Sequence, residues 1–192
     1  LLRDAVIGAE LELRYTLFAD YAAIARSARF VNRGALDLHL THAMSLNLDL
    51  PDSNYEFVHF SGAWARERHQ KVRRLEQGIQ SVESTRGTSS HNHNPFVILK
   101  RPETTEFSGE AIGFSLVYSG NFLAQIEVDT WDTTRVTMGI NPFQFDWKLA
   151  PNESFQTPEA VMVYAADGLN SMSQTFHKLY QKRLRSEERR VG

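Results

Sequence analysis

The strongest constraint on the fold is a two-residue alternation of apolar and polar side chains. Between Leu36 and Leu50 every even position except His42 is apolar, and the odd positions are mostly polar. A strand turns alternate side chains to opposite faces, so this pattern gives it one apolar face, whereas a helix would scatter the same residues around its axis. The segment predicts one long strand, or two strands continuous through a bulge near His42.

The alternation recurs along most of the chain. It predicts further strands at residues 11–17, 24–32, 55–60, 96–100, 112–118, 122–128, 135–140 and 160–164. Residues 129–133 read as the turn of a hairpin. The connections are rich in Gly, Pro, Asn and Asp and are too short for crossover helices, which implies antiparallel pairing. The expected fold class is therefore all-β, with antiparallel sheets packed as a sandwich.

One segment near the C-terminal end has helical spacing instead. Its apolar side chains fall on one face: Leu169, Met172, Phe176, Leu179 and Tyr180. Asn170 and Ser171 are candidate caps, and Ser171 with Gln174 has capping-box spacing. We therefore expect a β-sandwich over residues 1–167, a connector helix over 168–184, and a charged tail over 185–192 that need not belong to the native protein.

Composition excludes several classes of function. The chain has 192 residues, a net charge of −2, 42% hydrophobic residues and no cysteine. The balance of charge predicts neither nucleic-acid nor membrane binding, and the lack of cysteine excludes disulfides and thiol chemistry. The chain opens Leu-Leu-Arg-Asp, with no Met and no signal peptide, so we expect a cytoplasmic fragment whose true N-terminus is missing.

The stretch SSHNHNPF raises the question of a metal site. His91 and His93 are two residues apart, so on a strand their imidazoles would point the same way. A cupin-type site would need Glu at position 98 and Gly at position 85, but these positions hold Ile98 and Thr85. The spacing therefore supplies no third ligand for a metal. The alternatives are a polar loop that satisfies its own backbone and a loop that lines a ligand site. We expect no metal and no cofactor.

The stretch SGAWARERH is a second candidate. The face of Trp64 could stack on a sugar ring while Arg66 and Arg68 bond to hydroxyls. The alternative is a tryptophan that fills a gap between the sheets beside a solvated strand. No pair of carboxylates can be assigned as acid and base, and there is no Gly-x-Ser-x-Gly motif.

Six longer stretches resemble one family, and they occur in its order and spacing. They are ADYAAIARSARFVNRG, LPDSNYEFVHFSGAWARERH, GIQSVESTRGTSSHNHNPF, GFSLVYSGNFLAQIEVD, RVTMGINPFQFDWKL and SFQTPEAVMVYAADGLNSMSQTFHKLY. Together they resemble the N-terminal domain of the α-galactosidases of glycoside hydrolase family 36, from about residue 11 to 184. The opening strands of that domain are missing, and the tail after Leu184 departs from it.

The resemblance implies an antiparallel β-supersandwich whose C-terminal connector helix leads into a catalytic (β/α)₈ barrel. In this family the barrel carries the two aspartates that hydrolyse terminal α-galactosides, such as melibiose and raffinose, with retention. Neither aspartate has a counterpart here, so the chain alone should be inactive. The resemblance further implies a homo-oligomer and a galactoside substrate bound through the barrel.

We nominate two loops as contacts to substrate or to an interface. The residues are Trp64, Arg66, Arg68, His91, His93 and Asn94. The leading hypothesis is an accessory domain that supports the barrel and the oligomer. The alternative is an independent carbohydrate-binding β-sandwich.

Overall fold

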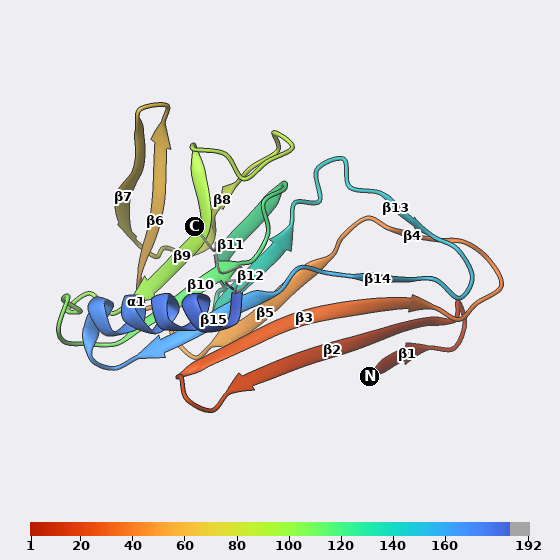
Figure 1. Ribbon diagram of the computed structural model, residues 1–192, viewed down its shortest axis with the longest axis horizontal. Coiled ribbons are helices and arrows are strands. Elements are labelled where there is room, and N and C mark those ends of the chain that lie inside the picture. Colours follow the sequence, from red (N-terminus) through yellow and green to blue (C-terminus); the bar gives the residue numbers. More distant parts are fainter. Residues whose placement is uncertain (185–192) are drawn as a thin grey trace, which may run out of the picture.

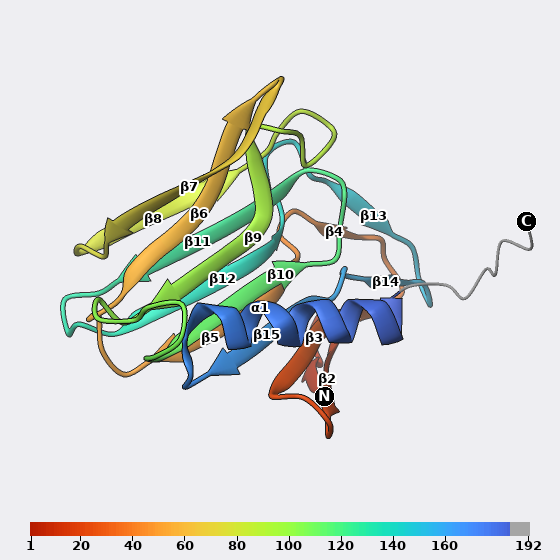
Figure 2. The same ribbon diagram turned by 60° about the vertical axis from the view of Figure 1, so that its left-hand side comes forward.

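Two antiparallel sheets packed face to face, with one helix on the outer face of the larger sheet, make up the molecule (Figures 1 and 2). The computed structural model describes residues 1–184. The strands are β1 (Leu2–Asp4), β2 (Ala9–Phe18), β3 (Ala23–Asn32), β4 (Leu38–Leu40), β5 (Met44–Leu50), β6 (Glu56–Ala63), β7 (Arg66–Arg74), β8 (Gly78–Glu83), β9 (His93–Lys100), β10 (Ala111–Leu116), β11 (Phe122–Val128), β12 (Thr134–Ile140), β13 (Trp147–Leu149), β14 (Ser154–Gln156) and β15 (Ala160–Ala165). They are followed by the helix α1 (Gly168–Leu179) and a short π-helix (Tyr180–Leu184).

The larger sheet has nine strands in the order β1-β2-β3-β15-β10-β9-β6-β7, with β14 also paired to β3. The smaller sheet has the order β5-β12-β11-β8, and β4 pairs with β13 in a separate ribbon. All these pairings are antiparallel. The expected all-β fold class with a single C-terminal helix is confirmed.

Two apolar cores hold the layers together. The first lies between the sheets and includes Phe57, Leu99, Phe114 and Phe122, none of which is exposed. The second lies between the larger sheet and α1, where Phe176 and Met172 pack on residues of β9, β10 and β15. The strands β9, β10 and β15 are thus covered on both faces, which explains their nearly continuous apolar runs.

The segment from Leu36 to Leu50 differs from both predicted forms. It is neither one strand nor a bulged one, because β4 and β5 belong to different sheets and are separated by residues 41–43. β5 pairs with β12, while β4 pairs with β13. Alternation reports a strand with one buried face, but it does not report which partner buries that face.

The predicted helix is present, but its predicted capping box is wrong. The N-cap residue is Asp167, without a side-chain cap, and Ser171 lies inside the helix. The first amide groups bond instead to carbonyls of the loop before β10: Gly168 N to Gly109 O at 2.9 Å and Leu169 N to Thr105 O at 3.1 Å. Backbone from elsewhere in the fold therefore satisfies the donors that a side chain usually caps.

Some segments do not match the alternation. β7 and β8 were not predicted, because all nine residues of β7 are exposed and β8 has one fully buried residue.

No helix in residues 1–184 has both the length and the apolar character needed to cross a membrane. The predicted charged tail, residues 185–192, lies outside the described residues.

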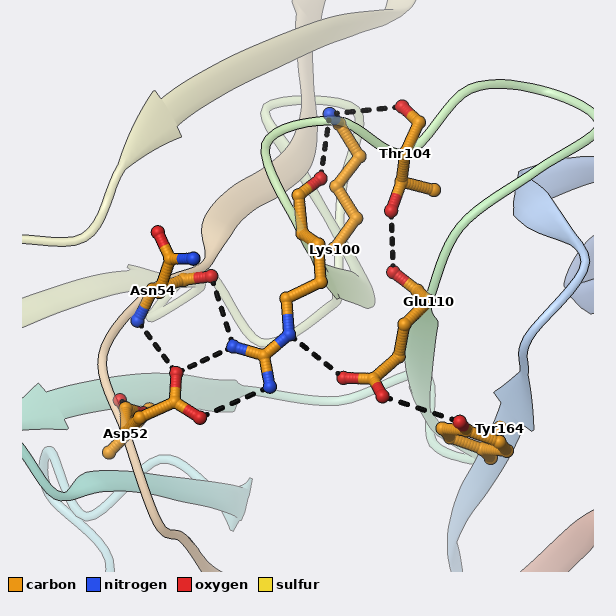
Figure 3. Close-up of polar contacts among 8 residues, drawn as sticks. Asp52, Asn54, Lys100, Thr104, Glu110 and Tyr164 are labelled. Carbon is orange, nitrogen blue, oxygen red and sulfur yellow. Dashed lines mark hydrogen bonds and ion pairs between the residues drawn. The ribbon is translucent and has the colours of Figure 1, made fainter.

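A polar network around Arg101 joins the turn before β6 to the start of β10 (Figure 3). Its guanidinium makes a bidentate pair with Asp52 at 2.5 and 3.1 Å and bonds to Glu110 at 3.1 Å. It also lies 4.0 Å from the centre of the Tyr55 ring. Tyr164 donates to the other oxygen of Glu110 at 3.3 Å. The hydrogen bonds from Arg101 hold the pKa of Asp52 below its usual range.

Candidate functional site

The hairpin of β6 and β7 carries the first predicted loop at its tip. It projects beyond the rest of the sandwich, at the top of Figure 1. Trp64 is 84% exposed in the turn, and the next residue, Ala65, has a φ of 61°. Glu67 accepts a hydrogen bond from the Ala65 amide at 2.9 Å, which stabilises the turn. Trp64 does not fill a gap between the sheets, so that interpretation of the residue is wrong.

A bulge near the tip sets the directions of the two arginines. The register shifts between Ser61 and Ala63, and Arg68 has a φ of 60°. A Cβ on Gly62 would lie 2.5 Å from the Arg66 carbonyl oxygen, so only glycine allows this close approach. As a result Arg66 lines a cavity on the face turned toward the second sheet, and Arg68 lines a cavity on the helix side.

The second predicted loop meets the same hairpin. His93 begins β9 and pairs with Ser61 across the strands, and the Gly62 amide donates to the Asn92 carbonyl at 3.1 Å. The structure thus brings the two motifs together, although residues 70–88 separate them in the sequence. His91 remains exposed on the loop before β9.

Alternation along β9 splits the predicted residues between the two faces. His93 faces the second-sheet side with Arg66, in a cavity of about 520 Å³. Asn94 faces the helix side with Arg68, in a cavity of about 560 Å³. The six nominated residues therefore form two sites and an exposed tip, and not a single site.

Two half-buried histidines lie side by side near the first cavity, which His93 lines and His59 does not. The ring centres of His59 and His93 are 6.0 Å apart, and neither Nδ1 atom has a hydrogen-bond partner. Burial lowers the pKa of His59 to about 4, with contributions from the charges of Arg73 and Lys71. Burial also lowers the pKa of His93. His59 was not predicted, because inside an apolar strand it carries no sequence signal beyond its polarity.

The helix-side cavity is mainly aromatic. Phe96 packs edge-on against Phe176 at 5.1 Å and lies 6.0 Å from Phe60. The Asn94 Oδ1 and the Tyr180 hydroxyl are buried among these rings without partners. Burial raises the pKa of Tyr180, which keeps this hydroxyl protonated. Apolar walls with two convergent polar atoms are typical of sites that bind small polar molecules.

The groups at these two sites are mainly hydrogen-bond donors and aromatic rings. Neither cavity is lined by a carboxylate. Within residues 1–184 no group of three or more histidines, aspartates or glutamates is placed to hold a metal ion. The exposed indole can stack on the face of a sugar ring, and the guanidinium and amide groups can bond to its hydroxyls.

Comparison with known proteins assigns the chain to a family. The model of the glycosyl hydrolase family 36 N-terminal domain matches residues 1–150. The chain belongs to this family. A second model, melibiase, matches residues 154–190 of the family 36 chain. That second match includes β15, which lies in the middle of the nine-stranded sheet.

The relatives of this family 36 chain are α-galactosidases. The α-galactosidase AgaA of Geobacillus stearothermophilus is 55% identical over 183 residues, which make up 95% of this chain and 25% of AgaA. A variant of AgaA solved in complex with stachyose has a TM-score of 0.94 at 54% identity, covering 96% of this chain and 26% of that one.

A third relative agrees with these two. The α-galactosidase of Lactobacillus brevis has a TM-score of 0.92 at 48% identity, covering 94% of this chain and 24% of its own. The family 36 chain therefore spans about a quarter of the length of the relatives that it matches.

Proposed function

We propose that this chain is the accessory β-sandwich of a retaining α-galactosidase. It would support a catalytic (β/α)₈ barrel and act on terminal α-galactosides, of the melibiose and raffinose type, only together with that barrel. The observation that carries the proposal is the TM-score of 0.94 over 96% of the chain with an AgaA variant bound to stachyose. Another AgaA variant was solved in complex with raffinose.

The candidate site supports this division of labour. Retaining hydrolysis needs two carboxyl groups about 5 Å apart across the scissile bond. The side chains that line the cavities of the hairpin are basic, amide, hydroxyl, aromatic or small, with no carboxylate among them, so they suit binding of a sugar and do not supply this pair. The two carboxyl groups would come from the barrel. The chain alone would be inactive.

Trp64 is the residue that we propose to reach the galactoside or a facing subunit. It stands at the tip of a hairpin that projects beyond the sandwich, and most of its indole is exposed. Arg66 and Arg68 flank it on opposite faces, and His91, His93 and Asn94 support the neighbouring loop. A projecting aromatic tip suits contact between subunits, so we include a homo-oligomer of the full-length protein in the proposal.

Two further parts of the proposal concern organisation and location. We propose that the sandwich ends at residue 167 and that residues 168–184 connect it to the barrel, since α1 begins at Gly168. We also propose a cytoplasmic location, because a chain without cysteine suits a reducing compartment.

A chimera tests the proposal. Residues 1–184 would replace the matching quarter of AgaA, and hydrolysis of raffinose and stachyose would be measured. We expect an active chimera and no turnover by the 192-residue chain alone. Turnover by the isolated chain would contradict the proposal, and so would a soluble, folded chimera without activity.

Trp64→Ala in the chimera tests the role of the hairpin tip. Loss of one aromatic contact should raise KM about two- to tenfold and leave the folding of the chimera unchanged. Trp131→Ala is the matched control, because Trp131 is 82% exposed in the turn between β11 and β12. Equal effects of the two substitutions would remove Trp64 from the proposed contact.

The alternative is an independent carbohydrate-binding module. The exposed Trp64 and the aromatic cavity around Phe96 favour it. It requires the isolated chain to bind galactosides at millimolar concentration, with binding lost in Trp64→Ala. No binding in calorimetry would exclude this function and leave the accessory role intact.

A further inference from the structure

The edge strand β7 concentrates positive charge in a chain whose net charge is −2. Within nine residues it carries five arginines and lysines and one glutamate. None of the five forms an ion pair with a carboxylate among residues 1–184. Like charges at this spacing repel one another, so the strand holds them at a cost that a bound anion would offset.

Strand register gathers part of this charge on one face. Lys71 lies opposite His59, and His69 lies opposite Ser61, which in turn pairs with His93 on the other side. Directly opposite residues share a face and have Cβ atoms about 5 Å apart. Five side chains from three strands therefore converge where the smaller sheet no longer covers the larger one.

Four of these side chains, Ser61, His69, Lys71 and His93, line the cavity of about 520 Å³ described above. Its donors are the Arg66 guanidinium, the Lys71 ammonium, the His69 and His93 imidazoles and the Asn92 amide. No carboxylate lines it. Two carboxylates of this region have other partners, since Glu67 accepts from the Ala65 amide and Glu83 accepts from Asn141 at 2.9 Å.

The cavity also contains unused hydrogen-bonding capacity. The Nδ1 atom of His93, which lines the cavity, is buried and has no partner. The Nδ1 atom of the neighbouring His59 is also buried without a partner, although His59 does not itself line the cavity. A buried polar atom without a partner costs free energy, and such atoms in a native structure commonly mark a place where another molecule bonds. Burial, followed by the charge of Arg73, lowers the pKa of both imidazoles, which favours their neutral forms.

We propose that this cavity binds a phosphoryl group, either as free phosphate or as part of a phosphorylated sugar. A tetrahedral dianion accepts bonds in several directions, which matches cations and imidazoles that reach the cavity from β7 and β9. A carboxylate is planar and carries a single charge, so it would leave part of this donor set unused. The binding does not require the α-galactosidase role proposed above.

Calorimetric titration of the full 192-residue chain with inorganic phosphate, at constant ionic strength set by chloride, tests the proposal. We expect saturable binding to one site. Lys71→Gln and Arg66→Gln should each weaken it about tenfold or more, because each removes a charge-assisted bond to the anion. Arg74→Gln is the matched control: it removes one charge from the same strand, but Arg74 lies opposite Glu56 and outside the cavity.

Several outcomes would overturn the proposal. The first is binding that does not saturate up to about 20 mM phosphate, because such an affinity is too weak for a built site. The second is equal weakening of phosphate binding by Arg74→Gln and Lys71→Gln, which would show non-specific attraction. Acetate binding as tightly as phosphate would show a carboxylate site instead. Glucose 6-phosphate distinguishes the two phosphoryl sources: tighter binding than phosphate identifies a sugar phosphate, and equal or weaker binding identifies free phosphate.

The imidazole resonances provide a second measurement that does not depend on substitutions. Phosphate in the cavity should shift the ring signals of His59 and His93 in the NMR spectrum of the unsubstituted chain. The signals of His39, which pairs with Asp146 on the separate ribbon, should not move. Movement of His39 alone, or of neither buried imidazole, would overturn the proposal.

Discussion

The strands β6 and β9 have two halves that differ in what covers them. In the half near Phe57 and Leu99 the second sheet lies over the pair, and both side chains are fully buried. In the half near Ser61 and His93 the second sheet has ended, and the same face bears polar and basic groups around a cavity. The strands run through both halves, but their pairing register shifts after His59 and again after Ser61, so the change from core to candidate site combines a loss of coverage with a local change in backbone pairing.

The largest effect should separate the two halves of β6 directly. Phe57→Ala removes a side chain with no exposed surface and should lower the free energy of unfolding by about 3–5 kcal/mol. Trp64→Ala, at the tip of the same hairpin, should change it by less than about 0.5 kcal/mol. Urea denaturation of both variants measures the difference. Similar losses would mean that the projecting hairpin is part of the cooperative core.

A second prediction concerns the network of hydrogen bonds and ion pairs around Arg101. Arg101→Gln leaves Asp52 and Glu110 without their cation and should cost about 1–3 kcal/mol, reduced by the partial exposure of the pair. Arg135→Gln breaks a pair with Asp49 that is half exposed and screened by solvent, so it should cost less than Arg101→Gln. Equal losses in urea denaturation would contradict the ranking.

The same network predicts that the free energy of unfolding depends on pH in acid solution. The pKa of Asp52 is lowered in the folded state, so its contribution is complete above the ordinary pKa of an aspartate and is lost as pH falls through the lowered value. Arg101→Gln should therefore be less sensitive than the unsubstituted chain when stability is measured below about pH 4. A parallel loss in both proteins would rule out this coupling.

A smaller effect should follow from distorting the hairpin without touching the core. In Gly62→Ala the new Cβ would meet the Arg66 carbonyl at 2.5 Å and the Glu67 Cα at 2.7 Å. The bulge must open, which we expect to cost about 1 kcal/mol because the exposed tip can relax. In the AgaA chimera the same substitution should clearly reduce the rate of raffinose hydrolysis, although the free energy of unfolding changes only by this small amount. Unchanged activity would show that the directions of Arg66 and Arg68 do not matter.

The last effect appears only in acid and concerns the boundary between the halves. The pKa of His59 falls to about 4 in the folded state, below its ordinary 6.5, so the unfolded chain binds more protons between these values. Stability should decrease as pH falls from 6.5 toward 4, and His59→Gln should flatten this decrease. His69→Gln, on the exposed edge strand, is the control. A decrease that persists in His59→Gln would assign it to other groups.

Much of the covered part of the fold could be predicted from the sequence. The strands β2, β3, β11, β12 and β15 lie where the alternation predicts them, within a few residues. β11 and β12 each have one buried face, which is what the alternation records, and β15 is covered on both faces. β2 is the exception, because only Glu10 is buried there and its apolar Tyr15 and Leu17 are exposed. The helix α1 was predicted for the same reason, from its apolar face.

The uncovered part could not be predicted in this way. β7 is a strand because it pairs with β6, and its nine exposed residues carry no apolar period. The candidate residues were identified by composition, but their separation into two cavities depends on a bulge at Gly62 and on the alternation of His93 and Asn94 across β9. His59 was missed, since its partner across the cavity lies 34 positions away.

The sequence by itself determined an all-β chain with one terminal helix, two polar loops and a resemblance to the N-terminal domain of family 36. These properties follow from local patterns and from long matching stretches, which need no knowledge of partners. The tertiary structure alone decided which sheet each strand joins, what caps α1, and that SSHNHNPF and SGAWARERH meet at one hairpin. The physical reason is that pairing and coverage are long-range: the same alternating strand is core or site according to what packs on it.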